Sequence, residues 1–269
     1  MPELPEVETI RRSLLANENA VLDKIEILHP GILRRQDFEP AKLHGKTIAQ
    51  IARRGKFLIF FFAESNEHLI IHLGMSGRFY MLEKDQPLTG KHIHAVLHLD
   101  NGRRLVYQDA RRFGGLWFVT DIEEFFSCMG CEPLEDEFTP ELLAKLVKDR
   151  KVAIKTLLLN QNLIAGIGNI YADEALFAAG ILPQRPAGSL TDEEIERLAQ
   201  AIKAVLSESI QQRGTTFRDF RDGYNQSGSF QNHLQVYGRC NEPCRVCGQP
   251  IVRERIGGRS SHYCQHCQH

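Results

Sequence analysis

Short apolar runs of strand length dominate positions 1–120, and a single helical stretch precedes them. In that stretch Val7, Ile10 and Leu14 recur at helical spacing, which predicts a helix that buries one face. The strand-like runs are KIEIL, KTIAQIARR, KFLIFFF, HLIIHL, AVLHL, RRLVY and GLWFV. The sequence DNG at 100–102 lies between two of them and is a strong hairpin signal. Many short strands with close turns predict an antiparallel sandwich or barrel.

The hydrophobic period changes after an acidic, proline-containing stretch that is typical of a linker. Helical spacing then runs through PELLAKLVKDR, IKTLLLNQ, YADEALFAAG and TDEEIERLAQAIKAVLSESIQQRG. In the last run Thr191, with Glu194 three residues on, predicts an N-cap, and Gly214 predicts the end of the helix. We therefore expect an α+β chain with these parts: a β-sandwich domain with a flanking helix at 1–120, a linker at 121–140, a helical domain at 141–234 and a cysteine-rich tail at 235–269.

Composition limits the class of protein without naming it. The chain has 269 residues, 42% hydrophobic and 25% charged, which is ordinary for a globular protein with room for two domains. Its longest apolar run, FLIFFFA, is too short for a membrane helix, and no signal peptide precedes it, so we expect a cytoplasmic protein without a membrane partner. The net charge is −1, but residues 211–269 hold eight Arg, no Lys and four acids, a local excess of +4. A neutral protein can thus present one basic face.

The cysteine-rich tail has the spacing of a zinc finger. A C-x2-C-x16-C-x2-C pattern runs through Cys244, Cys247, Cys264 and Cys267. Each C-x2-C turn offers two thiolates to one tetrahedral ion, so we predict one structural zinc with no catalytic role. Alternatives are a set of thiols without metal, or Cys240 or His266 as a ligand. Cys128 and Cys131 are expected to be spare thiols, as is Cys240. The seven cysteines are an odd number, which argues against a complete disulfide framework.

A basic hairpin is expected between the two cysteine pairs. The stretch RERIGGRSSH turns at its glycines and carries Arg253, Arg255 and Arg259. Arginines on a hairpin stiffened by zinc are suited to contact phosphate groups of nucleic acid.

Several strings of the sequence together resemble one enzyme family. PELPEVETIRR, HLGMSG, DARRFG, AGIGNIYADEALF, LQVYGR and the four-cysteine tail are similar to formamidopyrimidine-DNA glycosylases, which are bacterial enzymes that remove oxidised purines. The likeness runs in order from residue 2 to residue 267. It implies an N-terminal β-sandwich, a helix–two-turn–helix domain and a zinc finger. It also implies a monomeric, bifunctional glycosylase and abasic-site lyase that acts on double-stranded DNA with oxidised bases or abasic sites.

The resemblance makes Pro2 the expected nucleophile. A proline after Met is small enough that the initiator Met is normally removed, which leaves a secondary amine. An α-amino group has a pKa near 7.7–8.0, about two units below that of lysine, so more of it is unprotonated at neutral pH. Attack on C1′ would expel the base and leave a cationic iminium, an electron sink for β,δ-elimination. With Met1 attached, the nitrogen is an amide and cannot attack.

The family pattern assigns roles to further residues of the first domain. Glu3 matches the general acid that protonates the deoxyribose ring oxygen, and Glu6 matches a second carboxylate, although a first-turn acid is also favoured by the helix dipole. Lys56 matches a catalytic residue that contacts the phosphate next to the lesion. Met75, Arg111 and Phe113 match residues that fill the hole left by an everted base. His72, His92 and Arg112 match phosphate or sugar contacts.

Further DNA contacts are expected in the second half of the chain. Glycines before Asn169, at the start of a helix, predict a phosphate clamp. Lys155 matches a residue linked to oxidised guanine, and Tyr237 and Arg259 match phosphate contacts. We expect Glu174 to order the helix–turn region rather than to do chemistry.

The polar segment GTTFRDFRDGYNQSGSF at 214–230 is predicted to be a loop, which in the family closes over the flipped base. Thr215, Thr216, Arg218 and Tyr224 could supply hydrogen-bond donors to a purine.

Two alternative functions remain open from the sequence. One is an oxidised-pyrimidine glycosylase of the endonuclease VIII type, which begins with Gly where this chain has Leu4. The other is a zinc-finger protein that binds lesions without cutting.

Overall fold

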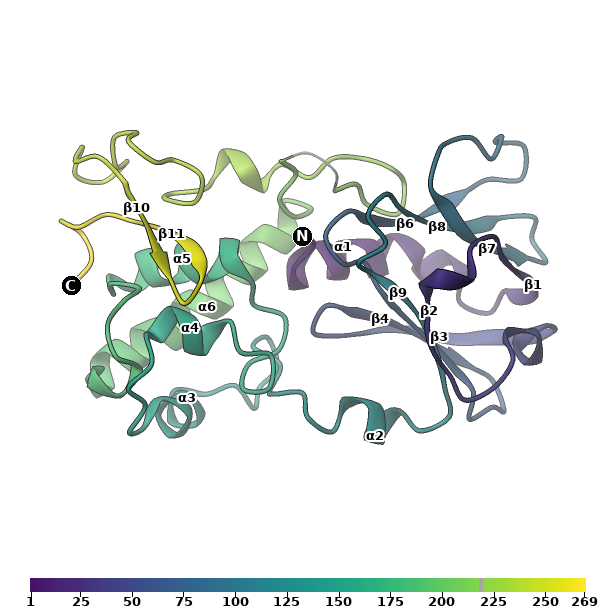
Figure 1. Ribbon diagram of the computed structural model, residues 1–269, viewed down its shortest axis with the longest axis horizontal. Helices are drawn as coiled ribbons and strands as arrows, with labels where there is room; N and C mark the ends of the chain where they lie inside the picture. Colours follow the sequence, from purple (N-terminus) through teal and green to yellow (C-terminus); the bar gives the residue numbers. More distant parts are fainter. Residues whose placement is uncertain (218–219) are drawn as a thin grey trace. The chain divides into compact units, whose positions relative to one another are not determined.

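The computed structural model describes residues 1–217 and 220–269, and it divides the chain into two compact units (Figure 1). The first unit is Met1–Cys128 together with Gln212–Gln231. The second is Met129–Gln211 together with Asn232–His269. Arg218, one of the candidate loop donors, lies outside the described residues.

The first unit contains a sheet of nine strands over the described residues. The strands are β1 (Val21–Ile27), β2 (Leu33–Gln36), β3 (Lys46–Arg54), β4 (Phe57–Phe62), β5 (His68–His72), β6 (Gly77–Leu82), β7 (Ile93–Leu99), β8 (Arg104–Asp109) and β9 (Gly115–Val119). Their order is β2-β9-β5-β4-β3-β1-β7-β8-β6. All neighbouring strands are antiparallel except β2 and β9, so the predicted antiparallel sandwich carries one parallel pair at its edge.

The sheet is folded into two layers. Its halves join through the short pairing of β1 with β3, where only Val21 and Leu22 find partners. Phe60 of β4 and Phe79 of β6, which are far apart in the strand order, place their ring centroids 5.9 Å apart. Both rings lie in one buried core, which contains residues of β1 and of β3 to β9. Leu33 of β2 is partly buried and packs against this core. The architecture is therefore a β-sandwich.

Helix α1 (Leu4–Leu14) completes this core. Its residues Val7, Ile10 and Leu14 are fully buried and join the sandwich core, as the helical spacing predicts. The segment 212–231 also packs on the first unit: Phe220 is buried in the same core, and the Gly223 N–H donates to Ser13 Oγ at 3.0 Å. The division into domains at 120, 140 and 234 stays a prediction, because packing alone does not say which segments fold independently.

The second unit contains most of the helices. They are α3 (Pro140–Val147), α4 (Ile154–Leu158), α5 (Asn169–Ala179) and α6 (Asp192–Gln211), with the short α2 (Ile122–Phe126) in the first unit. Short 3-10 turns lie at Leu15–Asn17, Pro30–Ile32, Pro40–Leu43, Ala187–Ser189 and Phe230–Asn232. Thr191 and Glu194 form the predicted capping box: the Glu194 N–H donates to Thr191 Oγ1 at 3.3 Å and the Thr191 N–H to Glu194 Oε2 at 2.9 Å.

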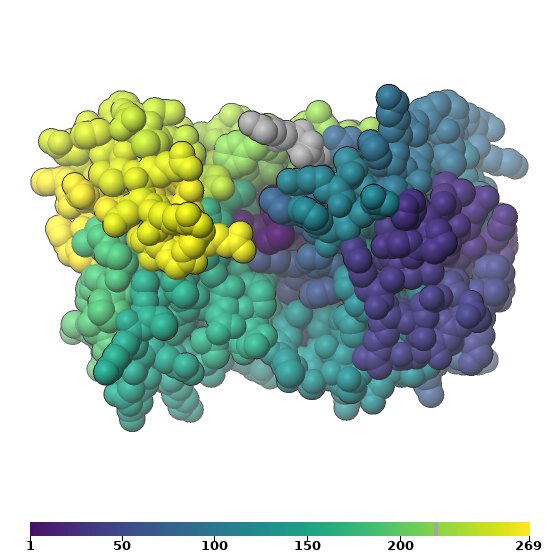
Figure 2. Space-filling view, in the orientation of Figure 1, coloured from purple at the N-terminus to yellow at the C-terminus, as the bar shows by residue number. Residues whose placement is uncertain are grey.

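The tail forms a hairpin of β10 (Val252–Ile256) and β11 (Arg259–Tyr263), which packs on α5. Gly257 and Gly258 have φ angles of +55° and +79°, which glycine adopts without the strain that a side chain would add. Figure 2 shows the tail, in yellow, on the surface beside the helices of its unit. No helix in the described part of the chain is long and apolar enough to cross a membrane.

Candidate functional site

The N-terminal residues form a tight, buried arrangement. Pro2 is buried, and the side chains of Glu3 and Glu6 are almost fully buried. The Glu3 N–H donates to Glu6 Oε2 at 2.8 Å, and the Glu3 carboxylate accepts from the Glu6 N–H, so the two residues form a capping box at the start of α1. Both carboxylates are thereby fixed next to Pro2.

Glu6 also holds the segment that returns from the end of α6. The Thr215 N–H donates to Glu6 Oε1 at 2.7 Å. Gly214 has a φ of +79°, and a Cβ there would lie 2.9 Å from the same oxygen. The second carboxylate predicted from the sequence therefore connects the N-terminus to the base of the segment 214–230.

Lys56 and His72 are brought together by the pairing of β4 with β5. Lys56 lies in the turn before β4 and is 7% exposed, and Phe57 is the cross-strand partner of His72. Burial, followed by the positive charge of Lys56, lowers the pKa of His72 to about 4. The Gly74 N–H donates to His72 Nδ1 at 3.1 Å, so the ring proton is on Nε2. The pair offers an ammonium and a neutral N–H, both suited to phosphate.

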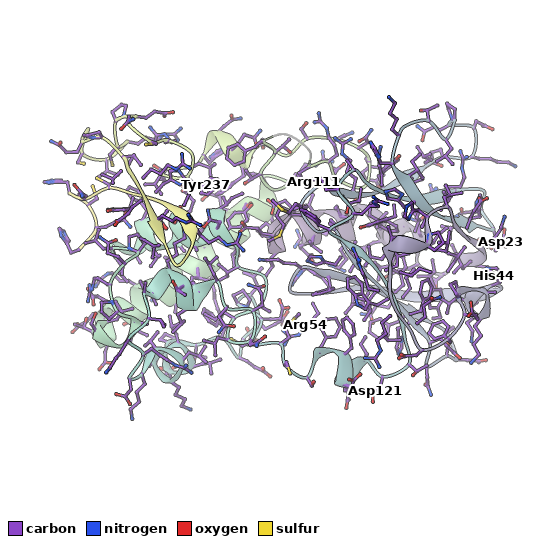
Figure 3. All side chains as sticks on the ribbon, in the orientation of Figure 1. Asp23, His44, Arg54, Arg111, Asp121 and Tyr237 are labelled. Atoms are coloured by element: carbon purple, nitrogen blue, oxygen red, sulfur yellow. The ribbon has the colours of Figure 1, made fainter. Side chains whose placement is uncertain are left out.

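The three predicted void-filling residues lie on two adjacent turns of the first unit. Met75 is in the turn between β5 and β6, and Phe113 is in the loop after β8. Arg111, which is labelled in Figure 3, lies in the same loop as Phe113. The Arg111 guanidinium carbon lies 5.5 Å from the centre of the Phe113 ring. Met75 is 41% exposed and Phe113 60%, so both apolar tips are accessible to a ligand. Exposed apolar tips on fixed turns are suited to insert between bases.

The remaining predicted contacts of the first unit lie on its surface. His92 and Arg112 are both exposed and have φ angles of +65° and +55°. Arg112 Nη1 lies 2.6 Å from His29 Nε2. Arg112 follows Arg111 in the same loop, whereas His92 lies just before β7 and its carbonyl accepts the Asp109 N–H at 3.0 Å.

In the second unit, Asn169 starts α5 and is half-buried, and Lys155 of α4 is fully buried. The Lys155 ammonium lies 2.6 Å from Asp173 Oδ1 and donates to the Ser260 carbonyl at 2.8 Å. Asn169 Nδ2 donates to the same carbonyl at 2.9 Å. The structure thus joins two residues predicted to contact DNA to the zinc-finger hairpin. A DNA contact of Lys155 stays a prediction, and its burial favours an indirect effect through Asn169 and the hairpin.

Asp173 continues this network and was missed from the sequence. Its Oδ2 accepts the His262 N–H at 2.9 Å, and His262 Nδ1 lies 3.2 Å away. Asp173 therefore bonds to α4 on one side and β11 on the other. No sequence pattern marks it, because its partners lie 18 residues before it and 89 residues after it along the chain.

Tyr237 is positioned by Glu174. The Glu174 carboxylate accepts the backbone N–H groups of 235, 236 and 237 at 2.8–2.9 Å. This confirms the ordering role expected for Glu174. The Tyr237 ring meets His262 edge-on at 5.0 Å, beside the β10–β11 hairpin (Figure 3).

Arg259 is exposed at the start of β11, and Arg253 and Arg255 are exposed on β10. The hairpin turn rests on α4, since a Cβ on Gly257 would lie 2.5 Å from Thr156 Oγ1. The predicted basic hairpin is therefore present and anchored on the helices of its unit.

The four tail cysteines fit a zinc ion. Their sulfur atoms all lie within 4.8 Å of one another, with Cys244 and Cys267 at 3.9 Å and Cys247 and Cys264 at 3.4 Å. A tetrahedral site with Zn–S bonds of about 2.3 Å needs sulfur atoms roughly 3.8 Å apart. Among the described residues, Cys240 and His266 are not part of this cluster. The structural zinc site predicted from spacing is confirmed, with those four ligands.

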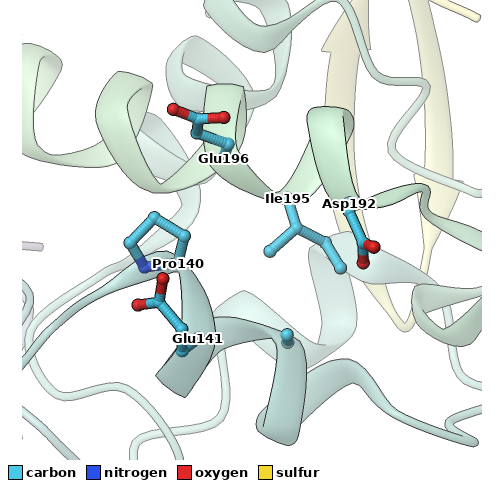
Figure 4. Close-up of a pocket in the computed structure, with 6 residues that line it drawn as sticks. Pro140, Glu141, Asp192, Ile195 and Glu196 are labelled. Carbon is cyan, nitrogen blue, oxygen red and sulfur yellow. The ribbon is translucent and has the colours of Figure 1, made fainter.

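A hollow elsewhere in the second unit does not suit DNA. It lies between α3 and α6, has a volume of about 330 Å³ and is lined by Pro140, Glu141, Ala144, Asp192, Ile195 and Glu196 (Figure 4). Three carboxylates would repel phosphate, and no residue predicted to bind DNA lines it.

Three family models match the chain in succession. They are the formamidopyrimidine-DNA glycosylase N-terminal domain over residues 1–116, the formamidopyrimidine-DNA glycosylase H2TH domain over 129–221, and the zinc finger found in FPG and IleRS over 241–269. The predicted order of sandwich, helix–two-turn–helix and zinc finger is confirmed.

Individual proteins match over their whole length. The curated formamidopyrimidine-DNA glycosylase of Syntrophomonas wolfei is 55% identical over 268 residues, which cover 100% of both chains. The crystal structure of the Fpg protein from Thermus thermophilus has a TM-score of 0.88 at 40% identity and covers 99% of this chain and 98% of its own. The complex of a Lactococcus lactis Fpg mutant with DNA containing Fapy-dG has a TM-score of 0.91, and the complex of Lactococcus lactis Fpg with DNA containing an abasic site has 0.90, each at 35% identity with 99% of both chains covered.

Proposed function

The chain belongs to the formamidopyrimidine-DNA glycosylase family, and we propose that it repairs duplex DNA by base excision. It removes oxidised purines such as 8-oxoguanine and formamidopyrimidines, and it then cleaves the strand at the abasic site by β,δ-elimination. Support comes from the Fapy-dG and the abasic site in the DNA complexes of the L. lactis relative, which shares the fold.

The observation that carries this proposal is the arrangement at the N-terminus, where the capping box fixes the carboxylates of Glu3 and Glu6 directly after Pro2 in the chain. After removal of Met1, the Pro2 nitrogen attacks C1′, and the base leaves with the electrons of the glycosidic bond and takes up the proton that the nitrogen gives up. Glu3 protonates the ring oxygen as the sugar opens, and the nitrogen lone pair completes an iminium. Loss of a C2′ proton then expels the 3′ phosphate, and a second elimination expels the 5′ phosphate.

The other predicted residues support these steps. Glu6 holds Glu3 in place, and Lys56 neutralises the phosphate next to the lesion. The remaining residues are proposed to contact or unstack DNA: His72, Met75, His92, Arg111, Arg112, Phe113, Asn169, Tyr237 and Arg259. Lys155, which is fully buried, is proposed to act on DNA binding indirectly, by fixing Asn169 and the zinc-finger hairpin. The zinc ion, held by four thiolates with no open position, stabilises the finger and takes no part in the reaction.

The amine is tested by borohydride trapping on a duplex that contains 8-oxoguanine. The chain without Met1 is expected to give a covalent protein–DNA adduct. The matched control is the same chain with one residue kept before Pro2, which turns the nitrogen into an amide. Met1 is 49% exposed, so the extension should leave the fold intact. The control is expected to bind the duplex without an adduct, and an equal adduct yield from both would overturn the mechanism.

Lesion preference is tested by comparing release of 8-oxoguanine with release of thymine glycol. Faster release of thymine glycol would favour the endonuclease VIII type. Binding without any release, from a chain shown by mass to lack Met1, would favour a protein that binds lesions without cutting. We further propose that the protein works in the cytoplasm as a monomer.

A further inference from the structure

Two turns of the first unit carry the residues proposed to fill the void in DNA. They are residues 73–77, with Met75, and residues 109–114, with Arg111 and Phe113. We propose that Asp109 is a positioning residue that fixes both turns before DNA arrives. This inference rests on the proposed function, because Asp109 would affect repair only by positioning the residues that fill the void in DNA.

Asp109 is the last residue of β8 and is fully buried, and each of its carboxylate oxygens accepts two hydrogen bonds. Oδ1 accepts from Ser76 Oγ at 2.6 Å and from the Arg111 N–H at 3.2 Å. Oδ2 accepts from the Gly114 N–H at 3.0 Å and from the Tyr107 hydroxyl at 3.4 Å. The Asp109 side chain therefore holds Ser76, Arg111 and Gly114, which lie on the two turns next to or among the void-filling residues.

The two turns also pack against each other without side chains between them. A Cβ on Gly74 would lie 2.3 Å from the Gly114 nitrogen and 2.5 Å from the Phe113 carbonyl carbon. A Cβ on Gly114 would lie 2.2 Å from the His72 carbonyl oxygen. These contacts leave the backbones no room to shift independently, so the bonds of Asp109 set the positions of both turns together.

Arg34 holds the second turn from its other side. From β2, its guanidinium donates to the Arg112 carbonyl at 2.6 Å and to the Gly114 carbonyl at 3.0 Å and 2.8 Å. These carbonyls flank Phe113 along the chain. The backbone is therefore held by hydrogen bonds just before and just after Phe113. Its exposed ring can rotate while the backbone that carries it stays in place.

Positioning of this kind matters because insertion into DNA has to offset the cost of unstacking a base. A turn that must also be ordered on binding adds an entropic cost to that step. The carboxylate is well suited to the task, because all four of its partners are donors and it has no donor of its own. An asparagine would direct an N–H2 group at two of those donors.

The test compares Asp109→Asn with wild type on two duplexes that both contain 8-oxoguanine. In the first the lesion faces cytosine, and in the second it faces an abasic-site analogue, so that no base pair has to be replaced. Asp109→Asn is expected to lower kcat/KM by about tenfold or more on the first duplex and by less than about threefold on the second.

The matched control is Asp37→Asn. Asp37 accepts the Thr120 N–H at 3.2 Å, beyond the end of β9, and pairs with Arg35 at 2.8 Å; neither partner belongs to the two turns. The same change from Asp to Asn at this position is therefore expected to leave the ratio of kcat/KM on the two duplexes at the wild-type value. Ser76→Ala removes the bond from Ser76 Oγ to Asp109, together with the bonds that this oxygen accepts from the Arg111 N–H at 3.3 Å and from Arg111 Nε at 3.4 Å. It therefore loosens the same two turns with little risk to folding. It is expected to show the same contrast at about threefold, even if Asp109→Asn fails to fold.

An equal loss on both duplexes, or no loss with either variant, would overturn the inference. Failure of wild type to release 8-oxoguanine from either duplex would instead overturn the proposed function. Release by wild type with unchanged variants would leave the proposed function intact and refute only the role of Asp109.

Discussion

His72 is a histidine whose surroundings keep it neutral. Its pKa is lowered to about 4 by burial and then by Lys56, and its Nδ1 is occupied by the Gly74 N–H. The imidazole can therefore donate from Nε2 over the whole physiological range without becoming charged. A phosphate contact made by such a group would depend little on pH near neutrality.

The same shift predicts how stability depends on pH. Between the ordinary histidine pKa of about 6.5 and the folded value of about 4, the unfolded chain binds more protons than the folded one, so the free energy of unfolding falls as pH falls. We expect His72→Gln to reduce this loss between pH 7 and pH 5. Urea unfolding of both proteins at the two pH values measures it. Parallel pH profiles for the two proteins would contradict the shift.

Lys155 shows what residue patterns do not predict. The sequence places it before a glycine-rich helix start and by resemblance near DNA, yet its charge is buried against Asp173. A buried ion pair depends on a partner supplied by the fold, and nothing local in IKTLL indicates one. Asp109 was missed for a related reason. Its role depends on the four hydrogen bonds that its carboxylate accepts, three of them from residues on two turns that come together only in the fold.

At the scale of elements, the start of α1 and the segment 212–231 depend on one carboxylate. Glu6 accepts one backbone N–H from each of them. The sequence predicts the helix correctly, because Val7, Ile10 and Leu14 recur at helical spacing. It does not predict the bond to Thr215, which spans 209 residues.

Glu6→Gln should therefore disturb both elements at once. The amide can accept at only one oxygen and directs its N–H2 group at the other donor, so we expect a loss of about 1–3 kcal/mol in the free energy of unfolding. We also expect slower borohydride trapping, because Glu3 loses its support.

Glu18→Gln is the matched control for Glu6→Gln. Glu18 accepts a single backbone N–H, from Ile51, at 2.8 Å, and it takes no part in the N-terminal arrangement by that bond. Chemical denaturation and trapping rates should separate the two variants. Equal trapping rates would show that Glu6 acts on stability alone.

The elements missed from the sequence are short or lack a clear pattern. Strand β2 reads LRRQ and pairs in parallel with β9, α2 lies in the stretch expected to be a linker, and β6 follows the turn that carries Met75. Each is held by tertiary partners rather than by its own periodicity. The long helix α6 and the strands with continuous apolar runs were predicted because their patterns extend over many residues.

At the scale of the whole molecule, the net charge does not indicate binding to nucleic acid. The protein is close to neutral, with a net charge of −1, yet Arg253, Arg255 and Arg259 are all exposed on one hairpin. Phosphate contacts release bound counterions, so they are visible in the salt dependence of binding even where the net charge is not informative.

Arg259→Ala is expected to weaken binding to all duplexes and to reduce the slope of log K against log[salt] by about 0.9, the value for one phosphate contact. Fluorescence anisotropy over a salt series measures the slope. Lys148→Ala, which removes an exposed positive charge just beyond α3, serves as the control and should leave the slope unchanged. A slope that stays at the wild-type value in Arg259→Ala would refute the contact.

The first unit is discontinuous along the chain, and this has a consequence for its biosynthesis. Phe220 and the Thr215 N–H belong to the first unit but leave the ribosome only after α3 to α6 have been made. At translation rates of about 5–20 residues per second, the nascent N-terminal sandwich waits several seconds for these last pieces. In a chain that ends before residue 215, Glu6 lacks the N–H of Thr215, so its set of hydrogen bonds at the N-terminus is completed only late in synthesis.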